Sequence, residues 1–351
     1  MNTSSLASPH IHIRTDWLAQ IKEEILFPEQ PIIDPHHHLW DRPGNRYLLD
    51  ELKTDLDSGH NVVATMYVQC RSMYKQNVEA KFQPIGEVEF ANGIAAQFAS
   101  GLYGNALGCA GIVGFADLLL GDDVDGVVQK LIAAGGGRLK GIRNTTAWHH
   151  HPDVVSNPIP PPAGLLTQDK FVNGARRLGQ HGLVLDVWAY HTQLGEVLEL
   201  ARTCPDTLIV IDHLGGPLGV GPYLNQHDSV FAEWFESIKP IAKLENVRMK
   251  IGGFGLKVLG YQFHTQSKPP DSDTLANAWK PYFERLIEVF GPNRCMFESN
   301  FPVDKGMFSY QVLWNAFKKL ATPFDKKDRN ALFYQTAMDT YSLDSSVIQS
   351  G

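Results

Sequence analysis

Short apolar runs alternate with longer amphipathic stretches along most of this chain. A polar or glycine-rich turn usually follows each run, and the next stretch has apolar residues at helical spacing. This alternation indicates βα units and a parallel sheet. The predicted strands are Pro31–Trp40, Val62–Gln69, Cys109–Phe115, Leu139–Arg143, Gly182–Tyr190, Thr207–Asp212, Val247–Gly252 and Arg294–Glu298.

Helices are predicted between these strands. Val124–Ala134 carries an apolar stripe and ends at three glycines, and Gln193–Arg202 and Leu275–Phe290 follow the same pattern. Residues 13–27 resemble a short amphipathic helix before the first strand. Eight strands with crossovers in about 320 residues favour a closed (β/α)8 TIM barrel, although spacing alone leaves a doubly wound sheet open. We expect an N-terminal extension, 1–30, and a single barrel domain, 31–351. The extension either covers a barrel end or mediates a dimer.

Composition narrows the class of protein. The chain has 351 residues, is 43% hydrophobic and 20% charged, and carries a net charge of −7, which suits a globular fold with a large core. No Lys/Arg-rich run and no long apolar segment is present, so neither nucleic acid nor a membrane is the expected partner. We expect a cytoplasmic, homo-oligomeric protein that acts on a small molecule. The four cysteines are scattered, without a CxxC pair, as in a reducing compartment.

The sequence Asp34-Pro35-His36-His37-His38 closes the first predicted strand. Alternate side chains of a strand share a face, so His36 and His38 point the same way, and Asp34 lies below them. Such a pair either holds a divalent metal through nitrogen or donates hydrogen bonds to a substrate carboxylate. A histidine-rich surface loop is the alternative, which the flanking Leu39-Trp40 disfavours.

Other chemically active side chains also fall at predicted strand ends. His191 and His213 end the fifth and sixth strands, and Arg143 ends the fourth. Active sites of (β/α)8 barrels lie at the C-terminal strand ends, so we expect these groups to meet. Arg143 and Arg71, which follows the second strand, are candidates to clamp a carboxylate. An ordinary surface role is the alternative for both arginines.

Lys250 lies within the seventh strand, and an inward-facing lysine needs a partner. In the eighth strand, Glu298 shares a face with Asn300, one layer deeper, and is expected to be a ligand, a proton carrier or the partner of a His or Lys. Asp304 is expected to be a cap or surface acid. Aromatic residues, among them Trp148 and Tyr190, suggest a flat or hydrophobic substrate. The pair His10/His12 and the run 149–151 are expected to be exposed to solvent, although His149 and Trp148 remain candidates for the mouth of the pocket.

Several segments together resemble one family. The strings IIDPHHHLW, VATMYVQC, GIVGFADL, LKGIR, IVIDHLGGP, MKIGG and CMFESNFPVD resemble the amidohydrolase-related (amidohydrolase 2) family of metal-dependent-hydrolase-like TIM barrels. They are more similar to its lactonase branch, which includes lactonases of 2-pyrone-4,6-dicarboxylate and of sugar acids. The resemblance covers roughly residues 30–345 in the family's order. It implies a TIM barrel with an active site at His36, His38, His191 and His213.

The resemblance also exposes a departure. The family's eighth strand closes with an Asp that activates water and, in metal-using members, binds the metal; here that position is Asn300. An amide cannot accept a proton from water and is a poor metal ligand. Either Glu298 or Asp34 supplies the carboxylate, or the reaction does not need this base.

The leading hypothesis from the resemblance is a hydrolase that opens a small carboxylated lactone or related cyclic ester. His36, His38 and Arg143 would orient the substrate, and His191, His213 or Glu298 would handle the proton. The runner-up is a decarboxylase or hydro-lyase of an aromatic or unsaturated acid. It would use one zinc or manganese ion on His36, His38 and His213, whereas lactonases of this branch work without a metal. A non-catalytic binding protein is the third hypothesis.

Overall fold

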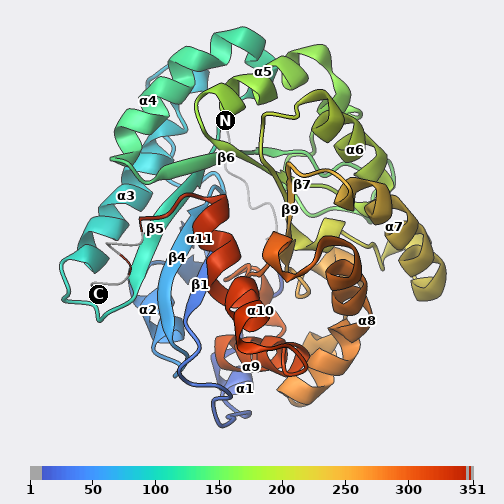
Figure 1. Cartoon of the computed structure of the whole chain (residues 1–351). Helices are drawn as coiled ribbons and strands as arrows, with labels where there is room; N and C mark the ends of the chain where they lie inside the picture. The colour runs from blue at the N-terminus through green and yellow to red at the C-terminus, as the bar shows by residue number, and fades with distance from the viewer. Residues whose placement is uncertain (1–9, 345–347, 349–351) are drawn as a thin grey trace.

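Eight parallel strands form the centre of the molecule in a computed structural model, which describes residues 10–344 and residue 348. The order around the sheet is β1-β4-β5-β6-β7-β8-β9-β10, and each neighbouring pair is parallel (Figure 1). The strands are β1 Ile32–His37, β4 Val62–Val68, β5 Leu107–Gly114, β6 Leu139–Thr145, β7 Val184–Trp188, β8 Ile209–Ile211, β9 Val247–Ile251 and β10 Cys295–Phe297. Each of the eight predicted strands therefore exists.

The barrel closes between its first and last strands near their carboxyl ends. The backbone N–H of Asn300 donates to the carbonyl of His36 at 2.9 Å, and that of His38 donates to the carbonyl of Phe301 at 2.7 Å. His37 and Phe301 form a parallel bridge. The expected (β/α)8 barrel is confirmed, and this seam places Asn300 directly beside the first-strand histidines.

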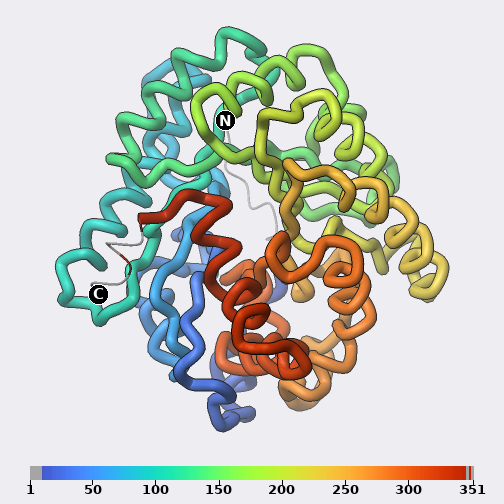
Figure 2. The backbone as a smooth tube through the Cα atoms, in the orientation of Figure 1, coloured from blue at the N-terminus to red at the C-terminus, as the bar shows by residue number. Residues whose placement is uncertain are grey.

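Helices surround the sheet on its outer side, as the backbone trace shows (Figure 2). Crossover helices in (β/α)8 barrels bury one face against the strands. The helices are α1 Thr15–Leu18, α2 Leu49–Leu56, α3 Ile85–Ala99, α4 Asp125–Gly135, α5 Asp169–Gln180, α6 Leu194–Thr203, α7 His227–Ala242, α8 Ser272–Phe290, α9 Tyr310–Leu320, α10 Lys326–Asn330 and α11 Thr336–Thr340. The helices predicted near α4, α6 and α8 are confirmed within three residues at each end.

The segment before the barrel is the part of the fold that the pattern predicted wrongly. A helix was expected over 13–27, but α1 covers only Thr15–Leu18. The following backbone is held by side chains of α9 instead. Asn315 accepts from the N–H of Leu26 and donates to the carbonyl of Glu24, and Gln311 accepts from the N–H of Glu23. These long-range partners satisfy the backbone in place of helical hydrogen bonds.

The first strand is also shorter than the predicted range Pro31–Trp40. It ends at His37, and Trp40 begins a separate two-stranded sheet of β2 Trp40–Arg42 and β3 Asn45–Tyr47. Gly44 has φ +70° in the turn between them, a conformation that favours glycine. This small hairpin brings Trp40 over the carboxyl end of the barrel.

The lower half of the barrel is filled with apolar side chains. Ile33, Met66, Val113 and Val210 point inward and pack against residues of α11, including Met338. The C-terminal helix therefore covers the amino-terminal barrel end (Figure 1). The polar side chains gather at the opposite end, which is where catalytic groups lie in barrels of this kind.

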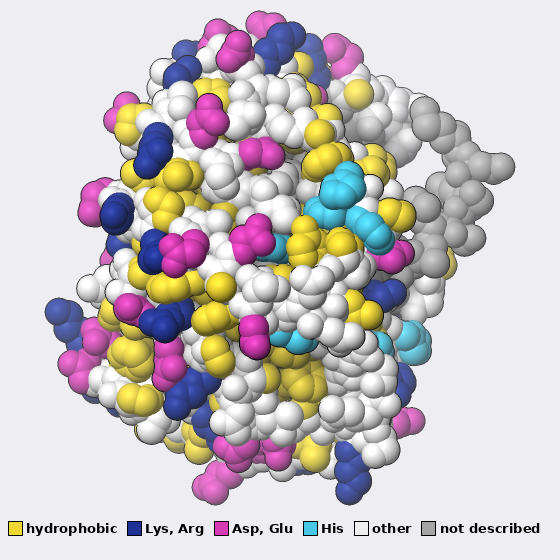
Figure 3. Space-filling model, turned by 90° about the vertical axis from the view of Figure 1, so that its right-hand side faces the viewer, with side chains coloured by type: hydrophobic (Ala, Val, Ile, Leu, Met, Phe, Trp, Pro, Cys, Tyr) yellow, Lys and Arg dark blue, Asp and Glu magenta, His cyan; other side chains and the backbone are white. Residues whose placement is uncertain are grey.

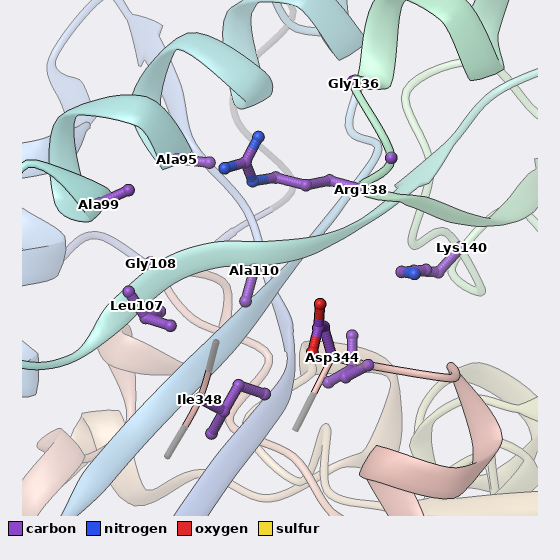
Figure 4. A pocket seen from close by; sticks show the side chains of 12 residues that line it. Ala95, Ala99, Leu107, Gly108, Ala110, Gly136, Arg138, Lys140, Asp344 and Ile348 are labelled. Atoms are coloured by element: carbon purple, nitrogen blue, oxygen red, sulfur yellow. The ribbon is translucent and has the colours of Figure 1, made fainter. Parts of the chain in front are cut away.

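A cavity of about 240 Å³ also lies at the amino-terminal end. Its walls include Leu107 at the start of β5, Arg138 and Lys140 around the start of β6, and Asp344 (Figure 4). Because these residues precede or begin their strands, the cavity is on the opposite face from the strand-end histidines. It is not part of the candidate site.

On the face shown in Figure 3, neither charge sign forms a large field. Basic and acidic side chains alternate across the face in Figure 3, where a group of histidines is also exposed. No described helix is long and apolar enough to cross a bilayer. All four cysteines are free thiols, and three of them are buried.

Candidate active site

Three imidazoles meet at the carboxyl end of the barrel. His36 and His38 share a face of the first strand, and their Nε2 atoms are 3.3 Å apart. The ring of His213, which follows β8, is centred 4.6 Å from that of His36. His37 points the other way and contacts the hydroxyl of Thr65 at 2.8 Å. The alternation predicted for the HxH pair is therefore present.

The partners of these rings fix their protons. His38 Nδ1 lies 2.7 Å from the carbonyl of Val68, which can only accept, so Nδ1 carries the proton. Arg143 can only donate, so at 3.2 Å it donates from Nη1 to His36 Nε2, and His36 is protonated at Nδ1. His213 Nδ1 lies 2.6 Å from the Glu298 carboxylate and donates to it. All three rings are therefore assigned a proton at Nδ1 and a lone pair at Nε2.

Glu298 ties two of the rings together from below. Its Oε1 accepts from the Nδ1 and the backbone N–H of His213, and its Oε2 lies 2.7 Å from His36 Nδ1. The side chain is fully buried. Burial alone raises the pKa of this carboxyl, but the neighbouring imidazoles outweigh burial and hold the pKa below its usual range. Glu298 is therefore an ionised anchor for both histidines.

Two glycines after β9 make room for this anchor. A Cβ on Gly252 would lie 2.4 Å from Glu298, and one on Gly253 would lie 2.6 Å from the His213 side chain. Gly253 also has φ +68°. The Gly-Gly pair is thus required by the close approach of the Glu298–His213 pair.

A network of buried charges lies beneath His36. Lys250 donates to Asp186 at 2.6 Å and lies 3.2 Å from Asp212, and Arg143 donates to Asp212 at 3.3 Å. Burial opposes the charge of Lys250, but these carboxylates raise its pKa. Burial raises the pKa of Asp186 to about 6. The pKa of Asp212 stays well below its usual value because Lys250, His36 and Arg143 outweigh its burial.

The end of the eighth strand holds an amide–carboxylate pair. Asn300 Nδ2 donates to Asp304 Oδ1 at 2.8 Å, and the N–H of Gly255 donates to Asp304 Oδ2 at 2.8 Å. Asp304 was expected to be a cap or surface acid; that was wrong, because its side chain is fully buried beneath the N-terminal segment and the β9 loop. Burial raises its pKa well above the usual range.

Asp34 is held away from the reaction centre. Its oxygens accept from the N–H of Ser299 at 2.9 Å and the hydroxyl of Tyr310 at 3.0 Å. These bonds join the first strand to the eighth strand and to α9. Asp34 is therefore a structural carboxylate, and the structure gives Glu298, not Asp34, the place beside the histidines.

Four other candidates lie outside these direct contacts. His191 is buried, accepts from the N–H of Leu218 and packs against Tyr223. Tyr190 hydrogen-bonds Ser156, and the half-buried Trp148 donates its backbone N–H to Gln193. Arg71 is exposed and reaches Thr145 at 3.4 Å.

The sequence reasoning assigned no role to Asp186 and Asp212, although each contacts Lys250. Asp186 is the single acid in the apolar run GLVLDVWAY, and Asp212 directly precedes His213 in IVIDH. A lone charge inside an apolar strand is the signal that identifies such residues, because it needs a buried partner.

The donor set fits a divalent metal. His36, His213 and Glu298 offer ligand atoms that all lie within 4.8 Å of one another, the one such group found among the described residues. The Nε2 atoms of His36 and His38 also face each other as lone pairs. Their separation of 3.3 Å would allow both nitrogens to bind one divalent cation. The Nδ1 protons are held by carboxylate or carbonyl oxygens, the usual support for metal-binding histidines.

Comparison with known proteins identifies a matching family and two similar proteins. The amidohydrolase family profile matches residues 33–343. An uncharacterised protein, y4mH, of Sinorhizobium fredii is 31% identical over 89% of this chain and 98% of its own length. L-fucono-1,5-lactonase of Burkholderia multivorans is 25% identical over 49% of this chain and 56% of its own length.

The fold also has solved counterparts. The crystal structure of an amidohydrolase from Burkholderia multivorans, with bound zinc, superposes with a TM-score of 0.68. The identity is 21%, and the match covers 89% of this chain and 99% of that one. At this identity the likeness supports the fold.

Proposed function

This chain belongs to the amidohydrolase family and is an enzyme of the hydrolase kind, and we propose that it opens a small carboxylated lactone or a related cyclic ester. The observation that carries the proposal is the Glu298–His213 pair at the carboxyl end of the barrel, in the same cluster as Arg143. His213 is a proton acceptor held by the Glu298 carboxylate, and Arg143 supplies a cation within the same buried cluster. The similarity to L-fucono-1,5-lactonase supports this choice of reaction.

Substrate binding falls to Arg143 in this proposal. Its side chain is 11% exposed, whereas Lys250 is fully buried. Arg143 is held by Asp212 and by the carbonyl of Gln69 at 2.6 Å, which orients the guanidinium. It therefore binds the substrate carboxylate or the lactone carbonyl oxygen, and Lys250 acts as a positioning residue that keeps Asp212 ionised.

The proton steps fall to His213. Its Nε2 takes a proton from water as the water oxygen adds to the lactone carbonyl carbon. The ring C–O bond then breaks, and the imidazolium returns the proton to the departing ring oxygen. Glu298, at 2.6 Å from Nδ1, stabilises the imidazolium between the two steps. Because Glu298 is enclosed by His36 and His213, it acts through them and does not touch the substrate.

A divalent metal is compatible with the same residues. His36, His38 and His213 would hold it through Nε2, with Glu298 as their anchor. A bound metal would polarise the carbonyl and lower the pKa of water. Arg143 now contacts His36 Nε2, so the guanidinium and a metal compete for that nitrogen.

The direct test is turnover on a panel of pyrone, muconolactone and aldonolactone substrates by the purified protein. We expect hydrolysis of at least one carboxylated lactone, and loss of it in His213→Ala. His150→Ala is the control, since His150 is exposed. Absence of turnover on every substrate of the panel would overturn the proposal.

A metal-dependent decarboxylase or hydro-lyase is the second candidate. The observation that favours it is the grouping of His36, His213 and Glu298, whose ligand atoms lie within 4.8 Å of one another, with His38 Nε2 3.3 Å from His36 Nε2. Near-stoichiometric zinc or manganese, with decarboxylation of an aromatic acid that chelation abolishes, would select this function. Lactone hydrolysis that survives chelation would select the lactonase.

A further inference from the structure

The segment before the barrel lies over the candidate active site. The His10 ring stacks on Trp40, with centroids 5.3 Å apart and planes 11° apart. Trp40 in turn lies 5.9 Å from the His38 ring, at 18°. His10 was expected to be exposed with His12; it is instead half-buried. A continuous stack therefore leads from the N-terminal segment to His38 of the candidate site.

The next residue of this segment fits against a glycine. A Cβ on Gly306 would lie 2.7 Å from both Cβ and the carbonyl oxygen of Ile11. Gly306 follows Asp304 in the loop after the eighth strand. The close approach requires glycine at this position, since any side chain would push Ile11 away.

A small cleft lies beneath these residues. The cleft beneath the segment has about 10 Å³, which is space for about one water molecule. Ligand sites for small molecules usually have several hundred Å³. The cleft is lined by His10, Ile11, Val155, Ser156, Gly255, Leu256, Lys257, Val258 and Val303.

The walls of this cleft are joined to the catalytic groups. Ser156 accepts from the indole N–H of Trp188 at 3.0 Å, and the Trp188 ring lies 4.7 Å from that of His213. Gly255 donates to Asp304, the partner of Asn300. The cleft therefore adjoins the candidate site.

Beyond this point the segment is anchored by hydrogen bonds and buried side chains. Arg14 donates to the carbonyl of His264 at 2.5 Å and Trp17 to that of Gln266 at 3.1 Å. Trp17 and Leu18 are buried. Residues 10 and 11 are half-buried, and their contacts with the barrel include the ring stack of His10 on Trp40 and the packing of Ile11 against Gly306. Such a segment opens at lower free energy than the core.

We propose that residues 10–13 form a lid, hinged at the Arg14–Leu18 anchor, that lifts to admit substrate and closes over it, separating the site from bulk solvent. The location of the site is taken from the proposed function. Closure places His10 and Ile11 in the wall that faces the substrate, so these residues also limit its size. Of the two roles expected for the extension, the contacts favour covering the barrel end.

The test uses Gly306→Ala in the full chain, which displaces Ile11 without touching a catalytic group. Diethyl pyrocarbonate modifies unprotonated imidazoles, and peptide mass spectrometry gives the rate at His38. We expect His38 to react at least about tenfold faster than in the parent protein, because the lid is held open. Gly126→Ala is the matched control, since a Cβ there meets nothing within 4 Å. The labelling rate of the exposed His150 serves as the internal reference for the activity of the reagent.

A second variant, with the chain deleted through Ile11, gives the same readout if Gly306→Ala fails to fold. Equal His38 labelling in the parent, Gly306→Ala and deletion proteins would overturn the lid. The labelling needs no turnover, so its result is independent of the lactonase assay. Fast labelling with no lactone hydrolysis would refute the proposed function and leave the lid in place.

Discussion

Glu298 Oε1 lies 2.6 Å from His213 Nδ1, while Oε2 of the same carboxylate lies 2.7 Å from His36 Nδ1. One buried anion therefore sets the tautomer of two rings at once. The eighth strand carries an amide at its end, yet the site retains a carboxylate one layer deeper. The Glu298 carboxylate hydrogen-bonds the imidazoles there, and it lies too deep to take a proton from water directly.

Glu298→Gln tests this arrangement. The amide offers one acceptor oxygen where two imidazole N–H groups need one each, so one ring must lose its carboxylate partner. We expect kcat to fall by about 10²- to 10⁴-fold, while the thermal midpoint changes little. The measurement is steady-state kinetics on the substrate found in the lactone panel.

The matched control is Glu284→Gln, an exposed residue paired with Lys280, which should leave kcat unchanged. A Glu298→Gln protein with full kcat would show that the carboxylate does not orient the catalytic rings.

Asn300→Asp should destabilise the protein, although it introduces the acid that the family resemblance predicts at this position. The new carboxylate would face Asp304 at the 2.8 Å now taken by an amide N–H. Two buried carboxyl groups this close must share a proton or repel, and either state costs free energy that the neutral amide does not, so we expect a loss of roughly 1–3 kcal/mol in the free energy of unfolding. Urea denaturation measures it.

The exchanged pair Asn300→Asp/Asp304→Asn should recover most of that loss. Its new amide can donate to the acid at 300 and accept from Gly255, which preserves both hydrogen bonds of the original pair. If the double variant is less stable than Asn300→Asp alone, the two side chains are not coupled in this way.

Lys250→Met should remove the cation that compensates Asp186 and Asp212. Breaking a buried ion pair costs about 3–5 kcal/mol of unfolding free energy. The pKa of Asp186 is raised from 3.8 to about 6. This carboxyl therefore favours the folded state when protonated, and its contribution is lost as pH rises from 3.8 through 6. The destabilisation by Lys250→Met should accordingly be smaller at pH 5 than at pH 8.

Urea denaturation at the two pH values checks this prediction. Lys280→Met is the control, because Lys280 is exposed in a surface pair, and such pairs contribute about 0–1 kcal/mol. Equal destabilisation by Lys250→Met at both pH values would mean that Asp186 does not titrate in this range.

The barrel and much of its candidate site can be predicted from the sequence for two reasons. Strand runs repeat along the sequence, and the carboxyl ends of parallel strands meet at one face. His36, Arg143 and His213 each lie at or just beyond such an end, so the topology alone brings them together. Their mutual contacts follow once the strands are assigned.

Other features depend on contacts that no local pattern encodes. Asp304 looks like a loop acid, but its burial comes from Gly255 and Asn300, and the former is 49 residues away along the chain. His10 looks like part of a polar tail, but Trp40 stacks on it. The helix expected over 13–27 is replaced by side-chain bonds from α9, nearly 290 residues away. In each case a tertiary partner overrides the local preference.

The lid should open as the pH falls. Burial, with a smaller contribution from the Arg42 guanidinium, lowers the pKa of His10 from 6.5 to about 4. The undocked His10 therefore binds a proton more tightly than the docked ring. Docking is fully favourable above pH 6.5 and weakens by up to about tenfold per pH unit between 6.5 and 4.

His10→Phe separates this effect from other titrations, because it keeps a ring for Trp40 and cannot be protonated. The labelling rate of His38 in the parent, relative to His10→Phe, should be near unity at pH 7.5 and rise by about tenfold at pH 5.5. A ratio that stays constant across this range would show that His10 does not control the lid. A ratio that rises would make the Trp40 stack the point at which protonation opens the site.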